Sequence, residues 1–209
     1  MTREQMDLLN AQLDRIRDNP RPGAHHDLRV KPLARWAPIT GAPPVVGIDP
    51  GHGGALVLLS DGAPPQIADL PLRKGELDRP VVDELKVEER LVTWKQQHPA
   101  LRVYMERSQS RTDDTPMTAL GIGRGAGALI AIVRLVRLPL WIVPPPTWQD
   151  AMLIDAEPHP DAEPGKERAA GRALELWPAA PWPRRPRVRR LCDGPIDAAL
   201  IAEYGRRRS

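Results

Sequence analysis

Val45-Val46-Gly47-Ile48-Asp49-Pro50-Gly51 and Ala55-Leu56-Val57-Leu58-Leu59-Ser60 are two apolar runs joined by a glycine-rich turn. This pattern predicts a β-hairpin whose first strand ends in the carboxylate of Asp49. An acid at the end of a strand is well placed to hold Mg²⁺, which binds oxygen ligands. The hairpin therefore predicts a metal-dependent site, provided that partner acids occur in comparable positions.

Three further acids occur in such positions later in the chain. A strand predicted at 101–106 ends in Glu106, and a helix with Pro195 in its first turn carries Asp197, four residues after Asp193. Residues four apart share one face of a helix. The four acids thus predict a carboxylate cluster that could hold a pair of divalent cations acting on a phosphodiester.

Each acid also has a simpler interpretation, which the sequence leaves open. Asp49 is a common turn residue before Pro-Gly, and Glu106 and Asp197 belong to residue types that usually face solvent. Asp193 fits a helix N-cap, because Asp-Gly-Pro often begins a helix. The four acids in this order favour the metal site.

From residue 45 onward, short apolar strands come first and then alternate with helices. Strands are predicted at 45–49, 54–60, 66–71, 101–106 and 140–143, and helices at 81–98, 117–138, 147–154, 165–177 and 195–206. This order is typical of an α/β fold in which helices cover both faces of a mixed sheet.

The ordered motifs resemble the RuvC-type Holliday-junction resolvases, and within them the shorter phage-like branch. The resemblance runs from about Val45 to Arg208 and is carried by Gly47–Gly51, Val103–Glu106, Gly121–Gly127, Val143–Trp148, Asp193 and Asp197–Tyr204. The gap of four residues between the last two acids is the feature that matches the phage-like branch.

The resemblance implies an RNase H-like fold with five strands, and a Mg²⁺-dependent endodeoxyribonuclease that cuts four-way or other branched DNA and leaves 5′-phosphates. Asp49, Glu106 and Asp197 match the metal-binding acids, and Asp193 matches the acid ahead of the last one. These four are expected to be catalytic and to hold two Mg²⁺ ions, for which Mn²⁺ could substitute, with Asp49 as the bridge. Lys166 matches a lysine near the scissile phosphate. Symmetric cutting implies a homodimer.

Three positions depart from the family pattern. Gln149 stands where relatives usually carry a phosphate-contacting lysine, and Cys192 stands where they often carry histidine. Gln109 occupies the place of an aromatic residue that the bacterial branch wedges into the junction. How this chain would open a junction is therefore left undetermined by its sequence.

Arginine is concentrated around the last helix, although the net charge is only +3. Basic residues beside a metal site are suited to a polyanionic backbone, and plain solvated surface is the alternative. The residues expected to bind nucleic acid are Arg124, Lys166, Arg184, Arg185, Arg187, Arg189 and Arg190. Arg206, Arg207 and Arg208 follow the helix, and DNA contact is less strongly indicated there.

The first 44 residues are predicted to be an extension of a nuclease domain at 45–209. Met6, Leu9, Leu13 and Ile16 have the spacing of a short amphipathic helix, and 20–44 contains six prolines, as in a linker. A frayed tail and a docking or dimer-stabilising arm are both compatible with this pattern.

The single cysteine excludes a disulfide framework. The protein is therefore expected in a reducing compartment, the cytoplasm of a bacterial or phage-infected cell. No membrane contact is expected, because the apolar run from Ala126 to Val133 is followed by Arg134 and Arg137.

Two other functions stay open. A junction-binding protein that no longer cuts would fit the missing lysine and aromatic residue. An ATPase of the actin or sugar-kinase type also begins with an Asp-bearing hairpin, but about 165 core residues leave no room for its usual second half.

Overall fold

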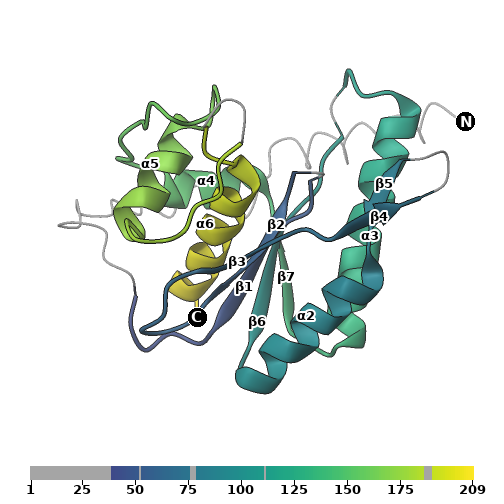
Figure 1. Cartoon of the computed structure of the whole chain (residues 1–209), viewed down its shortest axis with the longest axis horizontal. Helices are drawn as coiled ribbons and strands as arrows, with labels where there is room; N and C mark the ends of the chain where they lie inside the picture. Colours follow the sequence, from purple (N-terminus) through teal and green to yellow (C-terminus); the bar gives the residue numbers. More distant parts are fainter. Residues whose placement is uncertain (1–38, 52, 76–78, 111, 186–189) are drawn as a thin grey trace, which may run out of the picture. The chain divides into compact units, whose positions relative to one another are not determined.

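β1 (Val45–Asp49) lies at the centre of a five-stranded mixed sheet with the order β3-β2-β1-β6-β7. β2 (Ala55–Leu59) and β3 (Gln66–Asp69) are antiparallel to their neighbours, whereas β6 (Arg102–Glu106) and β7 (Leu140–Val143) continue from β1 in parallel (Figure 1). The computed structural model describes residues 39–51, 53–75, 79–110, 112–185 and 190–209. The predicted N-terminal helix, Arg187 and Arg189 therefore lie outside the described residues.

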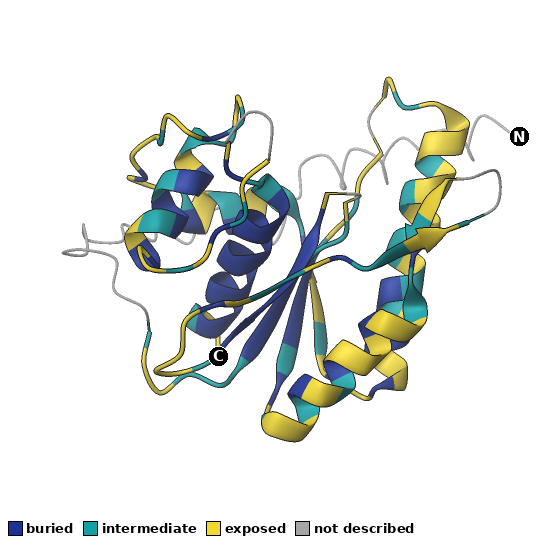
Figure 2. Cartoon of the chain, viewed as in Figure 1, coloured by how far each residue is buried: buried dark blue, intermediate teal, exposed yellow. Residues whose placement is uncertain are grey.

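Helices cover both faces of this sheet, as predicted. α2 (Glu84–Gln97) and α3 (Pro116–Leu135) lie on one face, and α4 (Pro145–Met152), α5 (Glu167–Leu176) and α6 (Asp193–Arg207) on the other. Alternate residues of β1 and β2 enter two separate cores, Val46 and Leu56 on the α2–α3 side and Val45 and Val57 on the α6 side. The central strands β1, β2 and β6 are largely buried on both faces (Figure 2). The strand order, with helices on both faces, confirms the α/β fold with an RNase H-like arrangement.

α6 is in direct contact with β1, with no side chain between the two backbones. Every residue from Gly194 to Arg206 is buried. A Cβ added to Gly47 would lie 1.9 Å from the carbonyl oxygen of Ala198, and one added to Gly194 would lie 1.9 Å from that of Gly53. Glycine is therefore required at Gly47 to let the helix reach β1, and at Gly194 to let its first turn reach the turn between β1 and β2.

The predicted elements differ from the observed ones at several places. α3 ends three residues earlier and α4 begins two residues earlier than predicted. β4 (Leu72–Lys74) and β5 (Pro80–Val82) form a separate two-stranded sheet that was not predicted, because three residues are too few to show a period of two. α2 begins three residues later than predicted, because the Asp83 side chain accepts a hydrogen bond from the Lys86 amide and caps it. α6 begins two residues earlier, at Asp193.

The C-terminal end of α6 is held by the buried side chain of Arg206, which pairs with an exposed acid. The guanidinium of Arg206 pairs with Asp61 and donates a hydrogen bond to the carbonyl of Ile39 at 2.8 Å. The Gly41 amide donates to the same Asp61 carboxylate. These contacts attach the segment before β1 to the domain, while the domain boundary at residue 44 stays a prediction.

Among the described residues, α3 is the helix long and apolar enough to cross a membrane, with a mean hydropathy of 1.4. Length and composition are weak evidence for a span, because core helices of soluble proteins pass the same test. Leu129, Ile132 and Val133 of α3 are buried in the core on the α2 side of the sheet. The expected absence of membrane contact stays a prediction.

The close contact at Gly47 predicts a severe effect of a single methyl group. Gly47→Ala should lower the free energy of unfolding by more than about 3 kcal/mol, because the added Cβ meets backbone atoms that cannot rotate away. The matched control is Gly121→Ala in α3, where an added Cβ meets no atom within 4 Å, and a gain of about 0.5–1 kcal/mol is expected. Urea denaturation measures both, and equal stability of the two variants would contradict the close packing of α6.

Candidate active site

Two acids lie side by side at the C-terminal ends of two adjacent inner strands, β1 and β6. The parallel register pairs Ile48 with Met105, so that Asp49 and Glu106 follow at the ends of adjacent strands. Because side chains alternate along a strand, both carboxylates point to the face that α6 covers. The Gly51 amide donates a hydrogen bond to Asp49 Oδ1 at 3.1 Å and fixes the Asp49 carboxylate.

A buried tryptophan holds the second carboxylate. Trp148 of α4 is fully buried, and its indole Nε1 donates to Glu106 Oε2 at 2.7 Å. Trp148 closes the Val143–Trp148 motif, but no function was predicted for its side chain. The sequence feature that could have indicated this function is the place of Trp148 in α4, the helix that follows β7. β7 lies next to β6, the strand that carries Glu106.

α6 brings the remaining two acids to the same place. Cys192 is the N-cap residue and Asp193 the first helical residue, so Asp193 is not the N-cap, which was the simpler interpretation. Its Oδ1 accepts a hydrogen bond from Arg185 at 3.4 Å. Asp197, one turn later, is only 5% exposed and precedes the residue that rests on Gly47. Asp197 therefore does not face solvent.

Lys166 lies among these acids. It precedes α5, and its Nζ donates to Asp197 Oδ2 at 2.5 Å. The other oxygen of this carboxylate, Oδ1, is buried and has no hydrogen-bond partner. Lys166 and Asp197 are thus in direct side-chain contact, while the expected position of Lys166 near a scissile phosphate stays a prediction.

Burial and the negative charge of neighbouring acids act on three of these carboxyl groups, those of Asp49, Glu106 and Asp197. Burial raises the pKa of Asp49 to about 6, and the negative charges of Glu106 and Asp193 act in the same direction. Burial also raises the pKa of Asp197 to about 6, although Lys166 opposes this. The pKa of Glu106 is raised by burial against the opposing effect of its bond from Trp148. The four acids therefore form one electrostatically coupled group.

The pKa of Lys166 is raised, because the attraction of Asp197, Asp193 and Asp49 outweighs the opposing effect of burial. Lys166 is therefore a cation at neutral pH, and its ammonium group is the positive charge that pairs with Asp197 among the four acids.

The oxygen donors fit a hard divalent cation by their chemistry. Carboxylates are the ligands that Mg²⁺ prefers, and the unpartnered Oδ1 of Asp197 is a buried acceptor that such an ion would satisfy. Within the described ranges, however, no three His, Cys, Asp or Glu side chains are arranged so that they could hold a metal ion together. The cation found beside Asp197 is the ammonium group of Lys166.

The described arginines before α6 are paired with acids. Arg184 contacts Asp161 at 2.8 Å, whereas Arg185 and Arg190 both contact Glu163, at 3.4 and 3.6 Å. All three arginine side chains are about half exposed. The acids that they contact were not identified from the sequence, because surface pairing across a loop has no periodic pattern.

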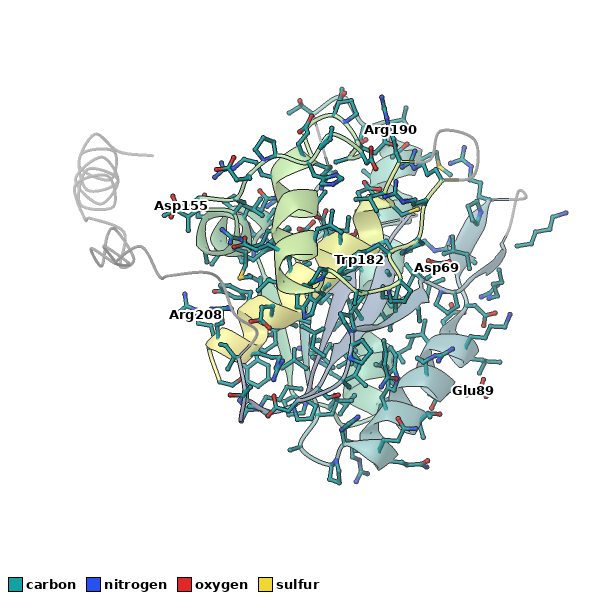
Figure 3. All side chains as sticks on the ribbon, turned by 60° about the vertical axis from the view of Figure 1, so that its left-hand side comes forward. Asp69, Glu89, Asp155, Trp182, Arg190 and Arg208 are labelled. Carbon is teal, nitrogen blue, oxygen red and sulfur yellow. The ribbon has the colours of Figure 1, made fainter. Side chains whose placement is uncertain are left out.

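The other basic residues singled out from the sequence lie on α3 and at the C-terminal end of α6. Arg124 is on α3 and lines a cavity of about 380 Å³ together with Pro50 and Gly51, which directly follow Asp49. Arg190 and Arg208 lie at opposite ends of α6 (Figure 3), which has 15 residues and a length of about 22 Å. Arg206 and Arg207 contact Asp61 and Glu203, so the C-terminal arginines do not flank the acids.

No protein-family model and no curated protein matches this sequence. Its structure is similar to RuvC of T. thermophilus in complex with a Holliday junction substrate, with a TM-score of 0.50 and 16% identity over 78% of this chain and 91% of that chain. A second Thermus thermophilus RuvC structure gives a TM-score of 0.48 and 18% identity, over 77% of this chain and 92% of that one.

The yeast mitochondrial Holliday junction resolvase Ydc2 gives a TM-score of 0.45 and 18% identity, over 93% of this chain and 83% of that chain. The match to T. thermophilus RuvC at a TM-score of 0.50 and 16% identity supports the RNase H-like fold, and that level of the predicted resemblance is confirmed.

The raised carboxyl pKa values predict how stability depends on pH. Between about pH 4 and 6 the folded protein binds more protons at Asp49 and Asp197 than the unfolded chain does. The free energy of unfolding should therefore fall as the pH rises through this range. Asp49→Asn, which removes a buried charge, should be more stable than the parent at pH 8 by about 2–3 kcal/mol, and much less so at pH 4.5.

Urea denaturation in EDTA at both pH values tests this dependence. Asp150→Asn is the control, because it removes an exposed acid from α4 and should leave the difference between pH 4.5 and 8 unchanged. A loss of stability in Asp49→Asn at pH 8 would show that Asp49 is a stabilising structural acid instead.

Proposed function

We propose that this protein is a divalent-metal-dependent, structure-selective endodeoxyribonuclease that cuts Holliday junctions or other branched DNA. The observation that carries this proposal is the meeting of four acids from three distant segments around one lysine. Asp49 and Glu106 come from neighbouring strands, and Asp193 and Asp197 from the helix that covers them. Burying carboxylates together is unfavourable for folding, and such groups commonly have a function.

The four acids have distinct functions in this proposal. Asp49, Glu106 and Asp197 would hold two Mg²⁺ ions, or Mn²⁺ in their place, and Asp193 would assist them. The ions would lower the pKa of the attacking water and stabilise the leaving 3′-oxygen, which gives a 5′-phosphate and a 3′-hydroxyl. Trp148 orients Glu106 through its indole hydrogen bond.

The basic residues would hold the DNA backbone next to the acids. Exposed ion pairs such as Arg184–Asp161 contribute little to stability, because water and salt screen them, so an arginine can exchange its carboxylate for a phosphate at little cost. We include Arg185 and Arg190 for the same reason, and Arg124 because it lines the cavity beside Pro50. Arg187 and Arg189 are included from the sequence alone.

Three further features belong to the proposal. A homodimer with one site per strand would cut a two-fold junction symmetrically. The gap of four between Asp193 and Asp197 is the support for placement in the phage-like branch. The alternative function is that of a protein that binds junctions without cutting them. It is supported by Gln149, which stands where relatives usually carry a lysine, and by the finding that no three acids in the described part of the chain are arranged to hold a metal ion together.

Cleavage of a synthetic four-way junction tests the proposed activity. The parent should cut with Mg²⁺ and should bind but not cut with Ca²⁺. Asp49→Asn and Glu106→Gln should each reduce the single-turnover rate by more than about 100-fold, beyond the loss typical of a residue that only supports a ligand. Junction affinity should be retained, because phosphate contacts dominate binding.

Asp150→Asn, an exposed acid on α4, is the control and should cut like the parent. Cleavage by Asp49→Asn at the parental rate would remove the acids from the active site. Tight junction binding by the parent without cleavage in Mg²⁺ or Mn²⁺ would favour the non-cleaving rival.

Trp148→Phe should separate the orientation of Glu106 from packing. The phenyl ring keeps the aromatic contact but cannot donate to Glu106, so cleavage should fall by about 10–100-fold and need more Mg²⁺ for half-maximal rate. Trp94→Phe is the matched control, because it removes a buried indole that donates to Gln66 at 3.2 Å, away from the acids. Stability should fall in both variants, and an equal loss of cleavage in both would assign Trp148 to packing alone.

A further inference from the structure

The ion pair between Lys166 and Asp197 joins two side chains that differ in their freedom to move. The Asp197 side chain is 7% exposed, whereas that of Lys166 is 36% exposed. Asp197 lies on α6, whose backbone is packed against β1. The ammonium group lies at the end of a flexible four-carbon chain. If the pair separates, it is therefore the lysine that leaves.

The backbone places Lys166 in this position by specific contacts. Gly165 has a φ of +82°, a conformation that favours glycine, and the Lys166 amide donates to the Glu163 carbonyl at 2.9 Å. Arg185 and Arg190 hold the side chain of Glu163. The loop before α5 is thus tied to the segment before α6, and both lead to the same acids.

One of the two carboxylate oxygens of Asp197 has a hydrogen-bond partner and the other has none. Oδ2 receives the ammonium hydrogen bond at 2.5 Å, and Oδ1 is buried without a partner. A divalent ion at Asp197 would compete with the ammonium group for the same carboxylate, because both are attracted by the same negative charge.

We propose that Lys166 is a built-in counter-ion that occupies the cation position of Asp197 in the metal-free protein and is displaced when a divalent ion binds. This inference rests on the proposed function. Displacement sends the ammonium group outward, where a DNA phosphate can receive it. Lys166 thus exchanges a carboxylate for a phosphate, and metal binding and DNA binding assist each other.

The exchange has a cost that can be measured without DNA or cleavage. Breaking the pair with Asp197 opposes metal binding, so the parent should bind divalent ions more weakly than a variant that has no lysine. Lys166 also contributes one positive charge to a group of four acids, and its removal increases their attraction for a cation. Both effects have the same sign.

Calorimetric titration of the full chain with Ca²⁺ tests the exchange. Lys166→Met should bind Ca²⁺ at least about tenfold more tightly than the parent. Lys95→Met is the matched control, because it removes an equal charge and a part-buried hydrogen bond, from Nζ to the Val136 carbonyl at 2.7 Å. The control should bind Ca²⁺ like the parent. Equal or weaker binding by Lys166→Met than by the parent would overturn the counter-ion inference and leave the proposed nuclease intact.

A second measurement uses the unsubstituted protein and needs no variant to fold. Reductive methylation followed by peptide mass spectrometry should show faster labelling of Lys166, relative to Lys95, when Ca²⁺ is added. Unchanged labelling of Lys166 in parent protein that binds Ca²⁺ would overturn the inference, and failure of the parent to bind Ca²⁺ or Mg²⁺ would overturn the proposed function with it.

Discussion

The contact between the backbones of α6 and β1 is the constraint on which the rest of the structure depends. Gly47 and Gly194 lack the side chains that would otherwise separate the helix from the sheet. Because the helix lies directly on the strand, Asp197 comes next to the strand end that carries Asp49. The same contact buries α6 from Gly194 to Arg206. A wider separation would leave the sheet intact but would place the acids in different environments.

Close packing at this end of the helix creates an electrostatic problem. Asp49 and Asp197 are desolvated, and their pKa values rise to about 6. The protein reduces this cost with Lys166, whose ammonium group pairs with Asp197, and with the hydrogen bonds from Gly51 and Trp148. The repulsion that remains between the carboxylates favours the binding of an added cation. Stability and the proposed metal binding are therefore opposed at the same residues.

The opposite end of α6 shows how the same helix is anchored. Glu203 is fully buried, and Arg207 contacts it at 2.8 Å, while Arg206 pairs with Asp61. Positive and negative charges are matched there, and the segment from Ile39 is attached through Arg206. The paired charges at the C-terminal end thus fix the position of α6. This allows its N-terminal end to carry more acidic than basic groups.

The sequence by itself determined the sheet, the helices that cover it and the strand ends at which Asp49 and Glu106 lie, because hydrophobic periodicity and parallel register act over short distances. It also gave the four acids as a set. It left undecided whether Asp193 is a helix cap, and it missed the β4–β5 pair, the pairing of the arginines with Asp161 and Glu163, and the bond from Trp148 to Glu106. Tertiary structure alone decided these, together with the contact of Lys166 and Asp197. The partners in the last two bonds are 42 and 31 residues apart, and such contacts depend on how closely helices approach the sheet, which no periodic pattern encodes.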